Sequence, residues 1–189
     1  MSKSEMLDTL TTQEKKDHVK SLCRFFKDFP KAGVNFLDIM PVFKTHKSME
    51  MAIDVIVDEI DQKKWKFEFI AGVEARGFLL GALLANRLHV GFIPIRKKGK
   101  LPGPVYQTET VKEYGGDCLE LQQDSDLVGK RVLIFDDVIA TGGTMLGTLD
   151  LLKKAGARVV GSAFLADIVY LNKVQGLDCE ICAPLKITS

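Results

Sequence analysis

The segment VLIFDDVIATGGT, residues 132–144, carries the clearest structural pattern in the chain. Its first four residues are apolar and favour a strand, and the glycines at 142 and 143 mark a turn into a helix. In an open parallel sheet, ligands bind at the carboxyl ends of the strands, where Asp136 and Asp137 would lie. We therefore expect a buried strand, a ligand-binding loop and a helix in this order.

The loop in this stretch is suited to a phosphate group. Residues 141–144, Thr-Gly-Gly-Thr, offer successive backbone N–H groups, two hydroxyls and a helix N-terminus, which together fit a phosphate monoester. The two carboxylates repel phosphate, but they suit ribose hydroxyls, a water-linked cation or positive charge that develops on a sugar. The combination predicts a sugar phosphate. The alternative is a structural junction in which the glycines only make the turn.

Outward from this stretch, the apolar spacing predicts strands that alternate with helices. The predicted strands are residues 67–73, 90–95, 131–135 and 157–165, and the predicted helices are 77–88 and 142–154. This alternation implies an α/β fold with a parallel sheet and helices on both faces.

Two further helices are predicted before the first strand. Thr11 and Glu14 form a capping box for a helix whose apolar spacing continues through Phe26 and which ends near Phe29-Pro30. A loop follows over residues 30–38, and Ser48 is the expected cap of the second helix. Between residues 97 and 116 the periodicity disappears, which predicts a loop about twenty residues long; a compact domain seldom carries such a loop without a use for it.

The composition indicates one globular domain. The chain has 189 residues, of which 46% are hydrophobic, and its formal net charge is +1. This charge supplies no field that would hold a long nucleic acid or an acidic membrane, so we expect neither as a partner. Residues 1–13 lack the pattern of a secretory signal, and we expect a cytoplasmic protein.

The four cysteines do not suggest a disulfide framework, because a chain of this size can fold without one. Cys179 and Cys182 form a CxxC pair, but the surrounding residues alternate like a strand, which would send the two sulfur atoms to opposite faces. The sequence has no second pair to complete a zinc site. We expect no metal or redox role for these thiols.

Residues 132–144 resemble the 5-phosphoribosyl-1-pyrophosphate (PRPP) motif of the type I phosphoribosyltransferases. Residues 29–39, 71–78 and 95–103 narrow this resemblance to the adenine phosphoribosyltransferase family, and the match runs from about Phe25 to about Leu171. The resemblance implies a Rossmann-like parallel sheet flanked by helices, in a single domain over residues 1–189. It places a small hood at about 1–45 plus the C-terminal tail, a core at about 46–171 and a mobile catalytic loop at about 97–116.

The activity implied by this resemblance is purine salvage, in which adenine and PRPP give AMP and pyrophosphate through an oxocarbenium-like transition state. A homodimer is implied, and Mg²⁺ is implied as a cofactor that binds mainly through the oxygens of PRPP and pyrophosphate, without direct protein ligation. Two alternatives remain: a phosphoribosyltransferase for another purine base, and a regulator that binds PRPP without catalysis. The regulator would need a DNA-binding element, and the full loop with Glu113 favours an enzyme that turns over its substrates.

The resemblance also implies which residues hold PRPP. Its ribose and 5-phosphate would bind at Asp136, Asp137, Ala140, Thr141, Gly142, Gly143 and Thr144, and its pyrophosphate at Glu74, Ala75, Arg76, Arg96, Lys97 and Lys100. A guanidinium at a strand-to-helix junction suits bidentate contact with phosphate, and the cations of residues 96–100 would neutralise PRPP. The peptide between residues 74 and 75 can be cis in the family. A surface ion pair and a solvated charge run are the alternatives.

The base and proton sites are implied in the same way. Adenine would bind at Asn35, Phe36, Leu37 and Ile139, with Phe36 stacked on the purine and backbone groups reading its edge. Asn35 and Leu37 depart from the family pattern, which often has a small apolar residue and an arginine there. Glu113, beside Tyr114 on the loop, would accept or relay the proton of the base, while Asp136 and Asp137 would offset the positive charge on the ribose. A core phenylalanine and a surface glutamate are the alternatives.

Overall fold

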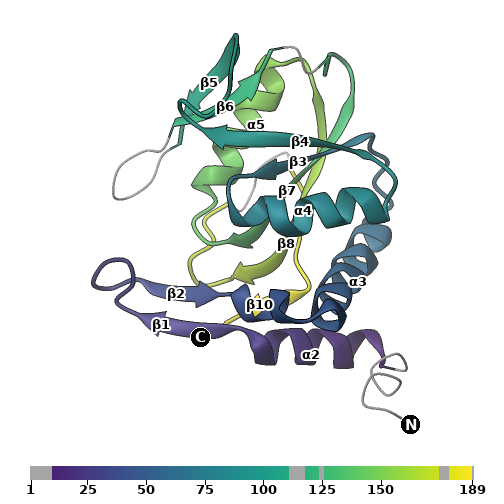
Figure 1. Ribbon diagram of the computed structural model, residues 1–189, viewed down its shortest axis with the longest axis vertical. Helices are drawn as coiled ribbons and strands as arrows, with labels where there is room; N and C mark the ends of the chain where they lie inside the picture. Colours follow the sequence, from purple (N-terminus) through teal and green to yellow (C-terminus); the bar gives the residue numbers. More distant parts are fainter. Residues whose placement is uncertain (1–9, 111–117, 124–125, 175–178, 189) are drawn as a thin grey trace.

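The structure is a computed structural model that describes residues 10–110, 118–123, 126–174 and 179–188. Its centre is an eight-stranded sheet in which the strands follow the order β10-β8-β7-β3-β4-β6-β5, and β9 pairs with β8 beside this path (Figure 1). A second sheet consists of β1 and β2. The predicted α/β fold is confirmed, with a mixed and mostly parallel sheet.

The middle of the large sheet is parallel. β3 (Phe69–Val73) lies between β4 (Gly91–Lys97) and β7 (Arg131–Ile139), and β7 pairs with β8 (Arg158–Ile168). The central strands β3 and β7 are near-continuous apolar runs because helices cover both faces of the sheet. Parallel strands end at the same edge, so the residues that follow β3, β4 and β7 meet there.

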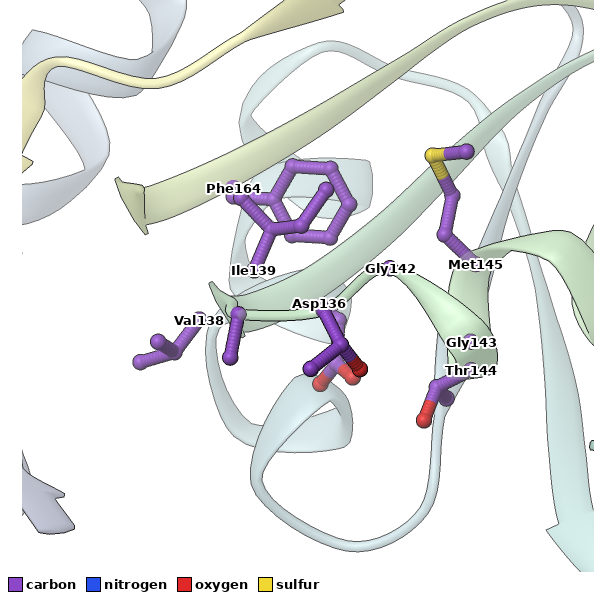
Figure 2. A pocket seen from close by; sticks show the side chains of 10 residues that line it. Asp136, Val138, Ile139, Gly142, Gly143, Thr144, Met145 and Phe164 are labelled. Carbon is purple, nitrogen blue, oxygen red and sulfur yellow. The ribbon is translucent and has the colours of Figure 1, made fainter. Parts of the chain in front are cut away.

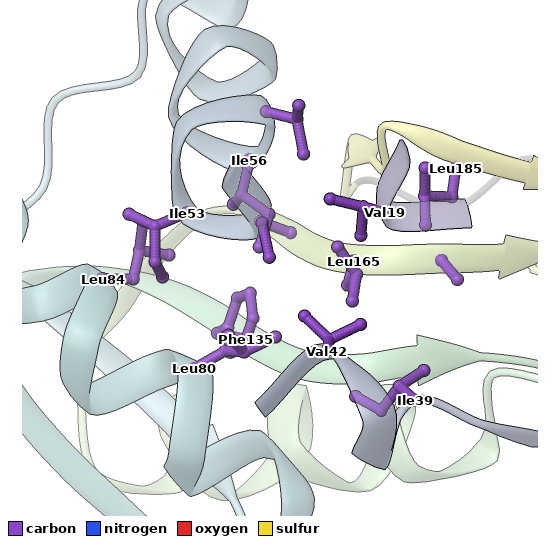
Figure 3. Packing of buried hydrophobic residues seen from close by; sticks show 14 of the residues in the cluster. Val19, Ile39, Val42, Ile53, Ile56, Leu80, Leu84, Phe135, Leu165 and Leu185 are labelled. Carbon is purple, nitrogen blue, oxygen red and sulfur yellow. The ribbon is translucent and has the colours of Figure 1, made fainter. Parts of the chain in front are cut away.

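Two hydrophobic cores lie on opposite faces of this sheet. Phe135 of β7 is fully buried in the core that also contains α3 (His46–Lys63) and α4 (Arg76–Arg87), as Figure 3 shows. Ile134, the residue before it, belongs to the second core, which contains α5 (Gly143–Lys154). This alternation fixes which face of the sheet each helix covers, with α3 and α4 on one face and α5 on the other.

The N-terminal segment differs from the prediction. α2 (Thr12–Leu22) begins behind the expected capping box but ends before the aromatic residues that we assigned to it. Residues Arg24–Lys27 form β1, which pairs antiparallel with β2 (Asn35–Asp38), a segment predicted as loop. The helical spacing up to Phe26 is misleading because aromatic residues also favour strands, and β2 supplies backbone hydrogen bonds to residues 24–27.

The helix α3 also begins earlier than predicted. Its N-cap is Thr45 rather than Ser48, and Thr45 Oγ1 accepts a hydrogen bond from the Ser48 N–H at 3.1 Å. The Ser48 hydroxyl is buried and donates to the carbonyl of Val42 at 2.7 Å. Ser48 therefore ties the helix to the preceding 3-10 turn, Met40–Lys44.

Part of the predicted loop over residues 97–116 is a strand. β5 (Val105–Glu109) pairs antiparallel with β6 (Cys118–Gln122), which in turn pairs antiparallel with β4. The predicted parallel sheet is therefore mixed at this side, where β6 runs antiparallel to both β4 and β5. Both strands are five residues long, too short for a clear period; β6 is held by pairing with β4, and β5 is held by pairing with β6.

The C-terminal segment adds strands to the large sheet, because β9 (Ile181–Cys182) and β10 (Leu185–Ile187) both pair parallel with β8. The predicted hood stays a prediction, although the described end of the tail belongs to the central sheet. Cys179 and Cys182 are free thiols, and both are buried. Within the described ranges, no helix has the length and apolar character needed to cross a membrane.

Candidate active site

Two adjoining pockets open at the edge of the sheet where β3, β4 and β7 end. The first has a volume of about 190 Å³ and is lined by Asp136, residues 138–145 and Phe164 (Figure 2). The second has a volume of about 150 Å³ and is lined by residues 73–76, Lys97, Thr110, Leu119, Asp136, Asp137 and Thr144. Because Asp136 and Thr144 border both pockets, one elongated ligand can occupy the two.

The first pocket is formed by the turn from β7 to α5. Gly142 is the N-cap of α5 and has a φ of +84°, a backbone conformation that favours glycine. A Cβ atom on Gly142 would lie 1.7 Å from Val174 Cγ2, so the turn also needs the space that glycine leaves. Figure 2 shows the side-chain oxygens of Asp136 and Thr144 on the same side of this turn. The helix N-terminus adds positive potential, which suits an anion.

Asp136 and Asp137 are closely surrounded by protein. Burial raises the pKa of Asp136 well above its ordinary value, and the charge of Asp137 raises it further. The Oδ1 atom of Asp136 accepts a hydrogen bond from the Asp137 N–H at 2.9 Å. Gly77 of α4 helps to enclose this carboxyl group, since a Cβ atom there would lie 2.7 Å from Asp136 Oδ1. The site therefore holds carboxyl groups that are costly to ionise without a positive partner.

Arg76, the first residue of α4, supplies positive charge to this pair. Its Nε atom lies 2.7 Å from Asp137 Oδ2, a carboxylate that is 4% exposed. Burial raises the pKa of Asp137, and Arg76 opposes that rise. The contact is an ion pair without a directed hydrogen bond. Among the residues that the structure describes, Asp137 Oδ2 and Asn35 Oδ1 are the buried side-chain atoms that lack a hydrogen-bond partner.

The same guanidinium reaches the predicted base site. The Arg76 Cζ atom lies 4.9 Å from the centre of the Phe36 ring, and Phe29 contacts that ring edge-on at 5.1 Å. Ile139 is buried and lines the first pocket. Leu37 is only 3% exposed and belongs to the hydrophobic core, so its side chain packs away from solvent. The structure thus brings Phe36 to the site and leaves only the backbone of Leu37 for recognition of a base.

The predicted pyrophosphate residues fall into two groups. Glu74, Ala75, Arg76 and Lys97 line the second pocket, and the peptide between Glu74 and Ala75 is cis. Arg96 does not line it; its Nη2 and Nε atoms donate to Glu74 at 3.1 and 3.2 Å, and its Nη1 atom donates to the Lys100 carbonyl. The hydrogen bonds from Arg96 and from the Lys97 N–H hold the pKa of Glu74 below its ordinary value. Glu113 and Tyr114 lie outside the described residues.

Comparison with known proteins identifies this arrangement. Residues 42–172 match the model of the phosphoribosyl transferase domain. The adenine phosphoribosyltransferase of Synechocystis is 43% identical over 159 residues, which cover 84% of this chain and 92% of the relative. The chain belongs to the adenine phosphoribosyltransferase family.

Solved structures agree with this assignment. The adenine phosphoribosyltransferase of Thermoanaerobacter pseudethanolicus superposes with a TM-score of 0.86 at 41% identity, covering 90% of this chain and 99% of that one. The Saccharomyces cerevisiae enzyme, in complex with adenine and an imino-altritol bisphosphate, superposes with a TM-score of 0.84 at 32% identity, covering 92% and 99%. The predicted family, fold and enzyme class are confirmed, and with them the prediction of an adenine-using phosphoribosyltransferase.

Sequence reasoning missed several residues of this adenine phosphoribosyltransferase site. Thr110 and Leu119 border the second pocket from the ends of β5 and β6, and Met145 and Phe164 border the first. Phe164 comes from the strand beside β7, and it pairs with Asp136 in the sheet register. Met145 directly follows the turn of residues 141–144, whereas Thr110, Leu119 and Phe164 lie outside the motifs that they complete and are revealed only by the three-dimensional pairing of strands.

The raised pKa of Asp136 predicts a variant that is more stable and less active. In the unfolded chain an aspartate ionises near pH ~4, whereas in the fold Asp136 holds its proton to higher pH, so stability falls as the pH rises from about 4 through the raised pKa. Asp136→Asn keeps an acceptor for the Asp137 N–H and removes this loss. We expect a higher thermal midpoint than the parent at neutral pH, a smaller difference near pH ~4 and strongly reduced activity. A neutral-pH midpoint at or below that of the parent contradicts this assignment.

The turn at Gly142 predicts a specific loss of phosphate binding. Gly142→Ala forces a Cβ atom against Val174 and strains the positive φ, so we expect AMP affinity to fall by roughly 10-fold or more in isothermal titration. Gly129→Ala is the matched control, because Gly129 also has a positive φ, +74°, but has nothing within 4 Å of a Cβ atom and lies before β7. Equal AMP affinity in the two variants would contradict this prediction, because it would show that a Cβ atom at residue 142 does not disturb phosphate binding.

Proposed function

We propose that the chain transfers the 5-phosphoribosyl group of PRPP to N9 of adenine, giving AMP and pyrophosphate. The observation that carries this proposal is the pair of pockets that share Asp136 and Thr144, one with a glycine turn at a helix N-terminus and the other bordered by Arg76 and Lys97. Such a pair fits a sugar with a phosphate at one end and a pyrophosphate at the other. The yeast relative holds adenine together with a bisphosphate.

The ribose and its 5-phosphate bind in the first pocket. Backbone N–H groups and hydroxyls of residues 140–144 hold the phosphate, and Asp136 and Asp137 hold the ribose hydroxyls. During the reaction the bond from C1′ to the pyrophosphate oxygen breaks, its electron pair leaves with pyrophosphate, and the N9 lone pair forms the new bond. The ribose carries positive charge in between, and two buried carboxylates stabilise that charge more strongly than solvent-exposed ones would.

The pyrophosphate binds in the second pocket. Arg76 and Lys97 supply positive charge, the backbone of residues 74 and 75 contributes polar groups, and Lys100 and Arg96 belong to the turn beside it. The guanidinium of Arg76 carries several N–H donors in one plane, which suits an anion with several oxygen atoms. Its ion pair with Asp137 holds the side chain at the pocket before the ligand binds.

Magnesium is part of this proposal as a companion of PRPP. In the described part of the chain, no three His, Cys, Asp or Glu side chains gather in a way that could hold a metal ion. The residues nevertheless fit a water-linked Mg²⁺, because hard carboxyl oxygen atoms of Asp136 border both pockets and those of Asp137 border the second. When bound, the ion would neutralise charge on the leaving pyrophosphate. The protein orients the ribose and the diphosphate of PRPP relative to the ion.

Adenine stacks on Phe36, next to Asn35, Ile139 and the backbone of Leu37. The base loses its imidazole proton as the glycosidic bond forms, and Glu113, with Tyr114 beside it, accepts or relays that proton. A homodimer is also proposed. Leu79 and Leu83 are 44% and 41% exposed one turn apart on α4, an apolar pair that a second copy of the chain would cover.

The choice of base separates this function from its nearest rival, a phosphoribosyltransferase for 6-oxopurines. Adenine donates at N6 and accepts at N1, whereas hypoxanthine reverses both roles, so a site built for one leaves buried groups unpaired with the other. We expect AMP formation from adenine and PRPP in the presence of Mg²⁺, with a kcat/KM roughly 10⁴ times that for hypoxanthine. Pyrophosphate release measured with each base decides it. Comparable rates defeat the adenine assignment, and PRPP binding without turnover favours a regulator.

If Phe36 stacks on the base, its removal should change the KM for adenine and not the KM for PRPP. Stacking of a base on an aromatic ring is worth about 1 to 3 kcal/mol, so Phe36→Ala should raise KM for adenine about 5-fold to 150-fold and leave KM for PRPP nearly unchanged. Phe25→Ala, an exposed aromatic residue on the paired strand β1, is the matched control. A large fall in thermal midpoint with unchanged adenine KM would assign Phe36 to the core instead.

A further inference from the structure

A buried carboxylate stands beside the site without taking part in the chemistry proposed above. Glu120 is the central residue of β6 and is only 3% exposed. In the sheet register it pairs with Arg96 of β4 on one side and with Gln107 of β5 on the other. Acidic side chains are seldom so fully buried unless they have polar partners, so the partners of Glu120 indicate its role.

Those partners come from the segment that follows β4. Glu120 Oε2 accepts a hydrogen bond from the Gly99 N–H at 2.9 Å, and Oε1 accepts one from Gln107 Nε2 at the same distance. Gly99 has a φ of +77°, so the chain turns back at this residue. The carboxylate therefore lies under the turn of residues 96–100 and joins it to the β5 strand.

Further hydrogen bonds show that this turn is docked on β6. The Lys98 N–H donates to the Cys118 carbonyl at 2.9 Å, and Gln122 Nε2 donates to the Pro102 carbonyl at 3.2 Å. On its other side, Glu74 accepts hydrogen bonds from the Arg96 side chain and the Lys97 N–H. Two carboxylates, Glu74 and Glu120, thus hold the basic turn from opposite sides.

The position of this turn matters for the second pocket. Lys97 lines that pocket, and Leu119, the neighbour of Glu120, lines it too. Successive residues of a strand point to opposite faces, so β6 presents Leu119 to the pocket and Glu120 to the turn. A shift of the turn would move Lys97 away from the place where pyrophosphate is proposed to bind, while the phosphate turn at residues 140–144 would stay.

We propose that Glu120 is a positioning residue for PRPP, which holds the cations of residues 96–100 at the pyrophosphate pocket through the Gly99 N–H. This inference rests on the proposed function. Under this proposal, the first part of the predicted mobile loop is an anion site that is already formed in the structure. Residues 96–109 are held in place by hydrogen bonds to Glu74 and Glu120 and by the pairing of β5 with β6.

Steady-state kinetics of Glu120→Ala and Glu120→Gln test the role. The alanine variant leaves the Gly99 N–H without its buried acceptor, and we expect KM for PRPP to rise roughly 10-fold while KM for adenine stays within about 2-fold. The glutamine variant can still accept from Gly99 through its amide oxygen, with its NH₂ group donating to the side-chain oxygen of a flipped Gln107, and we expect PRPP KM close to that of the parent.

Asp150→Ala is the matched control, because Asp150 lies on α5 and contacts the same hairpin. Asp150 Oδ2 accepts a hydrogen bond from Thr108 Oγ1 at 2.6 Å and so ties β5 to α5, away from the basic turn. We expect this variant to lose thermal stability without a change in PRPP KM. If Glu120→Ala does not fold, Glu120→Asp replaces it, because the shorter side chain keeps the charge but cannot reach both donors; the same PRPP-specific rise is expected.

Three outcomes overturn the proposal: an unchanged PRPP KM in the alanine or aspartate variant, an equal rise in both KM values, or a glutamine variant as impaired as alanine. The parent enzyme serves as the reference in the same assay. If the parent forms no AMP from adenine and PRPP, the proposed function fails, and that result is distinct from any failure of Glu120.

Discussion

Two adjacent carboxyl groups are buried near the end of β7, and the elements around the site are arranged to accommodate them. Asp136 and Asp137 follow four apolar residues whose side chains are buried alternately in the two hydrophobic cores. Because these side chains hold the strand in place, the two carboxyl groups stay buried. Gly77 lets α4 approach closely enough to enclose Asp136, and the same helix begins with Arg76, whose guanidinium opposes the negative charge of Asp137. The strand, the close helix and the cation are therefore parts of one arrangement, and a change in any of them alters the ionisation of the pair.

The acidic residues around the two pockets divide according to their surroundings. The pKa of Asp136 and of Asp137 is raised chiefly by burial, so these groups gain most when a positive sugar or its hydroxyl groups arrive. The pKa of Glu74 is lowered by the hydrogen bonds from Arg96 and the Lys97 N–H, so this group is satisfied without a ligand. Glu74 and Glu120 accept hydrogen bonds from the turn of residues 96–100, whereas the two aspartates are the groups proposed to face the substrate. Residues of one chemical type thus perform two tasks, which burial and hydrogen bonding decide.

The sequence predicts the parts of the fold that local pattern determines. The turn at residues 141–144 and the strand before it follow from an apolar run, two acids and two glycines, and the structure places them as expected. The same reasoning fails for residues 24–27 and 105–109, whose strands exist because a partner strand lies beside them, and pairing across the chain leaves little trace in a short segment. It also misses Glu120 for a physical reason: one glutamate in an apolar strand looks like an exposed residue until the turn that covers it is known.

Arg76 connects the two halves of the site. Its guanidinium pairs with Asp137 and also lies over the ring of Phe36, so one side chain contacts both the residues proposed to hold the sugar and the ring proposed to hold the base. In the proposed function, pyrophosphate, with its higher charge and several oxygen atoms, competes with Asp137 for the N–H donors of Arg76. A guanidinium that turns to the pyrophosphate uncovers the face of Phe36 and at the same time withdraws positive charge from Asp137. Loss of that charge raises the cost of ionising the buried Asp137, which the positive charge that develops on the ribose can offset, so the proposed binding of the leaving group, exposure of the stacking surface and ionisation of Asp137 are linked through one residue.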